Sequence, residues 1–256
     1  MKRVYRYGSE VNSHDLVKVL AISAMVVDHV GFYFLDDNIW FRIVGRMAAP
    51  LFFFLVGYSG SYRFKSQLVY FGVFLVVINY ITNSSDNIID HILPLNILLC
   101  FVAVKWLLGR VDVARWGTSG LVVLLCTLAV LAIPTSILVE YGAAGLSYAI
   151  GARLLQQKHP FAKAWISVAV FADFVMELLL LLVWNEHLDM NPKLFALAVV
   201  FLFIVYLTVL ALLIRHDFRT LGVRAALVRV PTMYVSRYSL EIYVIHLSAF
   251  RLITWY

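Results

Sequence analysis

Long apolar runs constrain the fold of this chain more than any other feature of its sequence. A helix needs about 20 mostly apolar residues to cross the hydrocarbon core of a bilayer, because each residue adds only about 1.5 Å. The runs that approach or reach this length are 14–34, 39–59, 66–83, 91–108, 117–135, 138–156, 162–184, 193–214 and 236–255. They lack the alternating pattern of β-barrel strands, so we expect about nine spanning helices, within a range of eight to ten.

The composition agrees with a membrane-embedded chain. Of the 256 residues, 62% are hydrophobic and 14% are charged, whereas a soluble domain is about half apolar and about a quarter charged. The spans use most of the length and leave no room for a second, soluble domain. We therefore expect an all-α, polytopic helical bundle in which residues 1–256 form one integral membrane domain surrounded by lipid.

In this nine-span arrangement the basic residues gather in every second loop. As a result, 17 of the 21 lysines and arginines lie on one side of the membrane. They are Lys2, Arg3, Arg6, Lys18, Arg63, Lys65, Lys105, Arg110, Arg115, Arg153, Lys158, Lys163, Arg215, Arg219, Arg224, Arg229 and Arg237. Because basic loops stay in the cytoplasm, the N-terminus is expected inside and the C-terminus outside. This asymmetry accounts for most of the net charge of +6, so no nucleic-acid partner is expected.

Several polar side chains interrupt the apolar runs at one level of the membrane. Asp28 and His29 lie in the outer half of the first run, and Arg42 and Arg46 lie four residues apart in the outer half of the second. Further polar residues approach this level from later runs: Asn96, Glu140, Tyr141 and His246. Ionisable groups in a bilayer are costly and usually face the protein interior or a wet cavity. Their convergence predicts a functional site, with a structural ion-pair network as the alternative.

The adjacent residues Asp28 and His29 are about 100° apart on a helix and can therefore face different partners. His29 is the expected proton acceptor, because a histidine is readily neutral and basic near pH 7. Asp28 is expected to pair with Arg42 or Arg46. Because Pro50 lacks an N–H group, the carbonyl of Arg46 loses its helical partner, which predicts a kink and a polar opening there.

A second acidic pair, Asp173 and Glu177, lies four residues apart on one face of the run 162–184. Carboxylates at this spacing carry protons or bind a cation in some membrane proteins, and arginines from a neighbouring helix would explain them equally well. The two cysteines follow no metal-binding spacing, and we expect no metal.

Five segments carry a set of motifs in a recognisable order. "LVKVLAISAMVVDHVGFYF" contains an Asp-His pair, and "FRIVGRMAAPLFFFLVGYS" contains an Arg-x-x-Gly-Arg-x-x-x-Pro-x-Phe run. They are followed by "LPLNILLCFVAV", "VEYGAAGLSYAIG" and "SLEIYVIHLSAF". Together these segments resemble the TraX family, with its Asn-containing span, its acidic-Tyr-Gly segment and its C-terminal His-Leu. "SLEIYVIHL" is also similar to the last span of larger membrane acyltransferases that modify sugars.

This resemblance implies an acetyltransferase in the bacterial cytoplasmic (inner) membrane. Acetyl-coenzyme A (acetyl-CoA) would be the donor, and the acceptor would be a pilin-like N-terminal amine or, by the second similarity, a glycan hydroxyl. The resemblance implies catalytic roles for Asp28, His29, Arg46 and His246. The residues expected to bind the donor are Arg42, Asn96, Glu140 and Tyr141. Among these groups, Arg46, Asn96 or Tyr141 would donate to the developing oxyanion.

Two other functions fit the same residues. One is a proton-coupled transporter that uses Asp28, His29, Asp173 and Glu177. The other is a non-catalytic membrane protein of pilus assembly, in which the polar groups hold helices together. If the chain is an acetyltransferase, the polar level lies in the outer half while acetyl-CoA is cytoplasmic. Donor and acceptor are then expected to enter from opposite faces.

Overall fold

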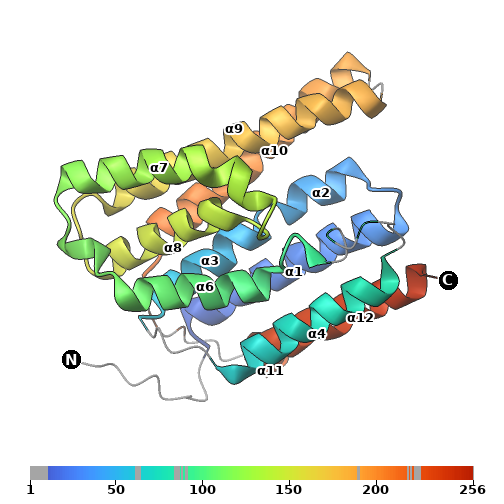
Figure 1. Ribbon diagram of the computed structural model, residues 1–256, viewed down its shortest axis with the longest axis horizontal. Coiled ribbons are helices and arrows are strands. Elements are labelled where there is room, and N and C mark those ends of the chain that lie inside the picture. Colours follow the sequence, from blue (N-terminus) through green and yellow to red (C-terminus); the bar gives the residue numbers. More distant parts are fainter. Residues whose placement is uncertain are drawn as a thin grey trace.

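The computed structural model describes residues 11–60, 65–83, 87, 89, 92–188, 191–217, 219, 221 and 226–255. Within these ranges the protein is a bundle of helices without a β-strand (Figure 1). The helices are α1 (Ser13–Phe34), α2 (Ile39–Gly45), α3 (Ala48–Tyr58), α4 (Ser66–Thr82), α6 (Ile97–Arg110), η1 (Val113–Arg115), α7 (Thr118–Ser136), α8 (Gly142–Gln156), α9 (Ala162–Leu188), α10 (Pro192–Ile214), α11 (Ala226–Arg237) and α12 (Ser239–Thr254). The basic residues that lie outside the described ranges are Lys2, Arg3, Arg6, Arg63 and Arg224.

Each predicted apolar run coincides with one or two of these helices. Among the described residues, five helical segments are long and apolar enough to cross a membrane. They are Ser13–Phe34, Ile39–Tyr58, Thr118–Ser136, Ala162–Val183 and Pro192–Ile214. Ser66–Thr82 is apolar but shorter. The chain is therefore an all-α membrane protein, while the count of nine spans stays a prediction.

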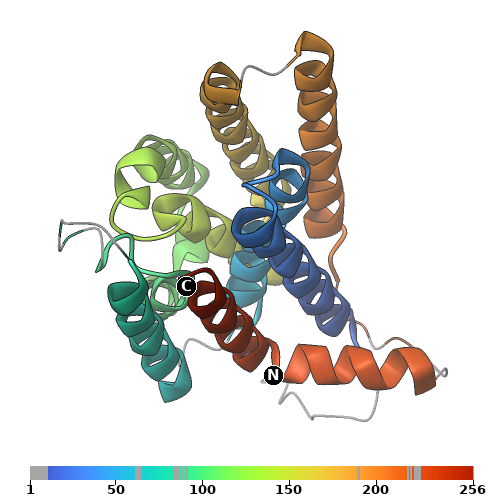
Figure 2. The same ribbon diagram turned by 90° about the vertical axis from the view of Figure 1, so that its right-hand side faces the viewer.

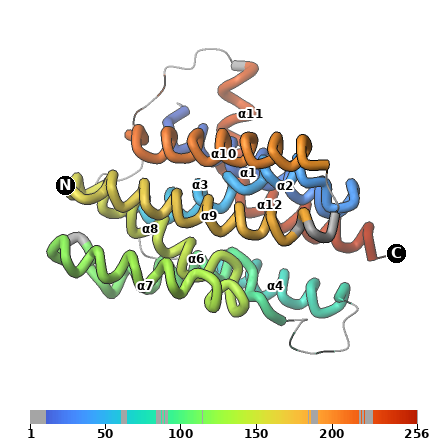
Figure 3. Tube along the Cα trace, turned by 90° about the horizontal axis from the view of Figure 1, so that it is seen from above, coloured from blue at the N-terminus to red at the C-terminus, as the bar shows by residue number. Residues whose placement is uncertain are grey.

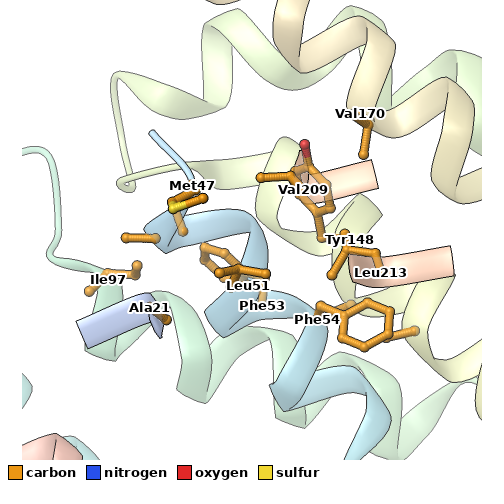
Figure 4. Close-up of a cluster of buried hydrophobic side chains, with 14 of the residues drawn as sticks. Ala21, Met47, Leu51, Phe53, Phe54, Ile97, Tyr148, Val170, Val209 and Leu213 are labelled. Carbon is orange, nitrogen blue, oxygen red and sulfur yellow. The ribbon is translucent and has the colours of Figure 1, made fainter. Parts of the chain in front are cut away.

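The centre of the hydrophobic core lies where α3 packs against α8 (Figure 4). Leu51, Phe53 and Phe54 of α3 are fully buried. The two backbones approach closely because α3 carries Gly57, where an added Cβ would collide with the backbone of Ala149. A tightly packed central pair of helices holds the surrounding helices, and the residues they carry, in fixed positions.

Large apolar side chains cover the outside of the peripheral helices. Val130 of α7, Phe171 of α9 and Leu197 of α10 are 76%, 65% and 55% exposed. Such a surface would be unfavourable in water, whereas the hydrocarbon of a bilayer solvates it. The exposed apolar side chains and the apolar length of these helices therefore both indicate contact with lipid.

The second long segment is broken at Arg46 and Met47, which separate α2 from α3. Pro50 lies in the first turn of α3 and has no N–H to donate to the carbonyl of Arg46. The predicted kink is therefore present. At the end of α2, an added Cβ on Gly45 would collide with the side chain of Asp28, so the break brings α2 directly against the polar part of α1.

Helix α11 differs from the prediction, which leaves residues 215–235 as a connecting loop. Figure 2 shows α11 perpendicular to the bundle helices at the edge of the bundle, and Figure 3 shows it projecting from one side. Its sequence carries polar residues and the internal Pro231, and these hide the apolar face from a search for continuous apolar runs.

The start of α1 anchors α11 and the chain before it. Asn12 and Asp15 form a capping box at the first turn of α1. The N–H of Ser13 donates to the carbonyl of Arg219 at 3.0 Å. The hydroxyl of Ser236 in α11 donates to a carboxylate oxygen of Asp15 at 2.5 Å. These bonds fix α11 at the end of the bundle where α1, α4 and α12 begin.

We call this end the basic end, because Lys18, Lys65 and Lys105 lie close enough there to interact electrostatically. His216, two residues beyond α10, also lies at this end, and its ring is 4.9 Å from that of His14 between centroids. Burial lowers the pKa of His216. The basic end therefore combines charged side chains with a packed histidine pair.

Candidate active site

A cavity of about 180 Å³ lies between α1, α3, α4, α6 and α12. Part of its wall is polar and consists of Asp28, His29, Glu140 and Tyr141. Most of the remaining wall is apolar, and it includes residues such as Leu68 and Leu240 from the first turns of α4 and α12. The cavity thus extends from these four polar residues towards the basic end.

A hydrogen-bonded histidine pair lies at this cavity. Nδ1 of His29 is 2.7 Å from Nε2 of His246, and Nδ1 of His246 is 2.7 Å from the carbonyl oxygen of Ile242. A carbonyl oxygen only accepts, so Nδ1 of His246 carries a hydrogen and donates it. In the neutral pair, Nε2 of His246 must then accept from the Nδ1–H of His29. This assignment leaves Nε2 of His29 without a hydrogen and with a basic lone pair.

Only His29 of this pair lines the cavity, and His246 supports it from α12. The two ring planes are inclined by 24° with centroids 5.0 Å apart, so the rings meet edge to edge through this hydrogen bond. The rings of Tyr33 and Tyr243 flank His29 at 6.2 and 6.5 Å. Tyr243 also lines the cavity. It was not predicted from the sequence, because an uncharged tyrosine within an apolar run does not stand out as a site residue.

Asp28 pairs with Arg42, the first of its two predicted partners. Arg42 Nη1 lies 2.8 Å from Asp28 Oδ2, and its Nε lies 3.1 Å from Asp37 Oδ1. The other oxygen of Asp28 is buried and has no hydrogen-bond partner among the described residues. Gly45 leaves the space that Asp28 occupies. Asp28 and His29 therefore face different partners, as their angular separation predicts.

Arg46 points to another part of the bundle. Its Nε lies 2.9 Å from a carboxylate oxygen of Glu177 in α9, and neither residue lines the cavity. Nearby, the hydroxyl of Tyr148 donates to Asp173 at 2.8 Å, and Tyr206 also bonds to this carboxylate. The sequence leaves two explanations of the acidic pair open. For Glu177 the structure shows the second, an arginine from a neighbouring helix.

Asn96 and Glu140 both hold the beginning of α6. The side-chain oxygen of Asn96 caps α6 by accepting from Leu98 N–H at 3.1 Å, and its amide donates to the carbonyl of Gly72 at 2.8 Å. Glu140 accepts from Ile97 N–H at 2.9 Å. Glu140 also lines the cavity, whereas Asn96 is buried behind it.

Tyr141 stands at the junction between the α7–α8 loop and α8. Its φ of 64° is in the left-handed region, where a non-glycine residue is uncommon. The centroid of its ring lies 6.1 Å from that of Phe53, so a core side chain packs against it. This unusual backbone conformation places Tyr141 in the cavity wall together with Glu140.

A third polar cluster joins α12 to α1 and α4. Arg251 donates to the hydroxyl of Tyr33 at 3.0 Å and to the side-chain oxygen of Asn79 at 2.5 Å. Because Tyr33 also flanks His29, this cluster supports the His29–His246 pair from the side opposite the basic end. Within the described ranges, no group of three His, Cys, Asp or Glu side chains is arranged to hold a metal ion.

The family model described as TraX protein matches residues 13–254. This chain belongs to the TraX family. The family is associated with conjugation and with the acetylation of pilin, and this TraX protein is a membrane protein of that family. It is also 26% identical over 170 residues to an uncharacterized protein of Rickettsia prowazekii (strain Madrid E), and the match covers 65% of each chain. No solved structure matches this TraX protein.

Proposed function

We propose that this TraX protein is a membrane-embedded acetyltransferase that moves an acetyl group from acetyl-CoA to an amine or hydroxyl acceptor. The observation that carries the proposal is the His29–His246 pair, which leaves one basic nitrogen at the cavity wall. Acyl transfer needs such a base to take a proton from the incoming nucleophile. The association of the family with pilin acetylation favours a pilin-like amine over a glycan hydroxyl as the acceptor.

In the proposed reaction, the acceptor nitrogen attacks the thioester carbonyl carbon while Nε2 of His29 takes the proton that the acceptor loses. The resulting imidazolium keeps its Nδ1–H bond to His246, so the pair needs no rearrangement. When the tetrahedral intermediate collapses, the carbon–sulfur bond breaks and CoA leaves as a thiolate. The proton on His29 then neutralises this thiolate, which restores the neutral pair.

Tyr141 is the best-supported donor to the oxyanion that forms during this attack. It lines the same cavity as His29. The other two predicted donors already have partners, because the amide of Asn96 donates to Gly72 and Arg46 pairs with Glu177. A hydroxyl donor held within a largely apolar cavity stabilises developing charge without a large rearrangement.

The shape of the cavity supports entry of the donor from the basic end. Its apolar wall reaches the first turns of α4 and α12, and the polar wall lies deeper. In the proposed topology the basic end faces the cytoplasm of a bacterium, which contains acetyl-CoA, and the protein lies in the inner membrane. The acceptor would then approach from the opposite face.

The transporter alternative has less support from the geometry. A proton path would require Asp173 and Glu177 to line an opening through the bundle. Instead, Asp173 accepts from Tyr148, Glu177 pairs with Arg46, and neither carboxylate lines the cavity. Hydrogen bonds and ion pairs between side chains of neighbouring helices hold membrane helices together.

Incubation of the purified full-length protein with acetyl-labelled CoA tests the proposal. The label should move to an added primary amine, or should be released slowly by hydrolysis. His29→Ala should abolish both reactions. The control His159→Ala removes a histidine of the α8–α9 loop that does not line the cavity, and it should retain them. Absence of both reactions in the unmodified protein would contradict an acetyltransferase.

A further inference from the structure

Helix α11 contributes no residue to the wall of the candidate active site and is oriented unlike the helices of the bundle. Figure 2 shows that it runs perpendicular to the bundle helices at the edge of the basic end, and Figure 3 shows that much of it projects beyond the neighbouring helices. An amphipathic helix that runs perpendicular to the spanning helices, at the level of their ends, is oriented to lie in the plane of the bilayer surface. The side chains of α11 should therefore match the region where lipid headgroups meet hydrocarbon.

One side of α11 is fixed to α1. Thr232 and Ser236 are buried, and the hydroxyl of Ser236 donates to Asp15. Because these two residues are four apart, they lie on the same side of the helix. The opposite side is therefore turned away from α1.

That opposite side is apolar and aromatic. Leu227 is 91% exposed and Tyr234 is 62% exposed, and Val230 and Tyr238 are also exposed. The spacing of three or four residues places all four along one stripe of the helix and its final turn. Tyrosine is enriched where a membrane meets water, because its ring is apolar and its hydroxyl is polar.

Arg237 borders this stripe, and Arg229 lies further round the helix, towards the side of Ser236. Arg229 and Arg237 line a shallow groove on the helix together with Val230, Met233 and Tyr234. The guanidinium group binds phosphate oxygens through paired N–H donors. The groove therefore combines two phosphate-binding side chains with apolar groups that contact hydrocarbon.

We propose that α11 is an interfacial helix whose groove binds the phosphate headgroup of an anionic phospholipid. In this arrangement Arg229 and Arg237 contact the phosphate, and Leu227 and Val230 contact the upper part of the acyl chains. Water solvates the exposed apolar stripe poorly and hydrocarbon solvates charged guanidinium groups poorly, whereas the interface offers a suitable environment to both. The proposal does not depend on the proposed acetyltransferase activity.

The test uses the full-length protein in detergent micelles mixed with equal amounts of phosphatidylcholine and phosphatidylglycerol. Native mass spectrometry counts the lipids that remain bound. Phosphatidylglycerol should be preferred, and the double variant Arg229→Gln/Arg237→Gln should reduce that preference by about tenfold or more. The double variant Arg229→Lys/Arg237→Lys, which keeps the charge, should retain part of it.

A matched control separates a local site from net charge. Lys158→Gln/Lys163→Gln removes two exposed positive charges, from the α8–α9 loop and from the first turn of α9, and should leave the preference unchanged. The unfolding temperature of both glutamine variants in phosphatidylcholine alone verifies that each is folded. An equal loss of preference in the two variants would overturn the proposal.

A second arm distinguishes the source of the phosphate. CoA also carries phosphates, so its binding is measured for the same variants in phosphatidylcholine alone. The arginine variant should bind CoA as the unmodified protein does. If it loses CoA binding while it keeps its preference for phosphatidylglycerol, the groove serves a soluble ligand and the lipid proposal is wrong.

Discussion

The His29–His246 pair and the Arg46–Glu177 pair have the same appearance in the sequence, since both combine polar residues from apolar helices. Their surroundings differ. His29 lines a cavity, and its hydrogen bond to His246 leaves a second ring nitrogen available. Arg46 and Glu177 satisfy each other, and neither side chain lines that cavity. We therefore expect chemistry where an unsatisfied atom of an intramembrane polar residue meets accessible space, and helix association where two charged groups satisfy each other.

The largest expected effect concerns the ionic pair. Arg46→Met should destabilise the protein by about 3–5 kcal/mol, because it leaves the carboxylate of Glu177 buried without its cation. Arg46→Met/Glu177→Leu should recover most of this loss, since it removes both charges. Thermal unfolding in detergent measures the stability of each variant. If the double variant is as unstable as Arg46→Met, the pair does not act as a closed structural unit.

A smaller effect is expected from the residue that orients the proposed base. His246→Ala should lower turnover by about 10- to 100-fold, as the loss of an orienting side chain typically does. The unfolding temperature should change little. His246→Gln should restore part of the turnover, because its carbonyl oxygen can accept the bond from His29. A purely structural role would instead lower stability and turnover together, without rescue by glutamine.

Substitutions at two glycines distinguish the candidate site from the hydrophobic core. Gly45→Ala and Gly57→Ala each introduce a methyl group that collides, with Asp28 in one case and with the backbone of Ala149 in the other. Overpacking of this kind costs about 1–3 kcal/mol. Only Gly45→Ala should also lower the turnover of the folded fraction, because it displaces the Asp28–Arg42 pair beside the cavity. Equal turnover of the two folded variants would contradict a role for that pair.

The smallest effect is expected at the basic end and concerns pH. Burial lowers the pKa of His216 in the folded protein, so the unfolded chain binds more protons as the pH falls below about 6.5. The contribution of His216 to stability is therefore present above that pH and is lost below it. His216→Gln should flatten the acid side of a plot of unfolding temperature against pH. An unchanged slope would assign the acid sensitivity to other groups.

The helices were predictable because their signal is local. A long apolar run specifies a membrane helix without knowledge of its neighbours, and each predicted run coincides with helix. Helix α11 was missed because only one of its sides is apolar. An amphipathic period in residues 227–238 was the signal that would have found it.

The contacts of the site were predictable only in part. Depth in the membrane correctly indicated that Asp28 has an arginine partner. It did not distinguish Arg42 from Arg46, because the break after Gly45 decides which of them faces α1 and which faces α9. The hydrogen bond between His29 and His246 joins residues 217 positions apart, and no local pattern encodes it.

The most direct test of this account compares His29→Gln with Glu177→Gln in one assay of acetyl transfer, with each rate divided by the amount of folded protein. The account predicts that His29→Gln lowers turnover by at least about 100-fold while it remains stable, because it removes the base. Glu177→Gln should lower stability and leave the turnover of the folded protein close to that of the unmodified chain. A loss of turnover in Glu177→Gln as large as that in His29→Gln, or unchanged turnover in His29→Gln, would contradict the account.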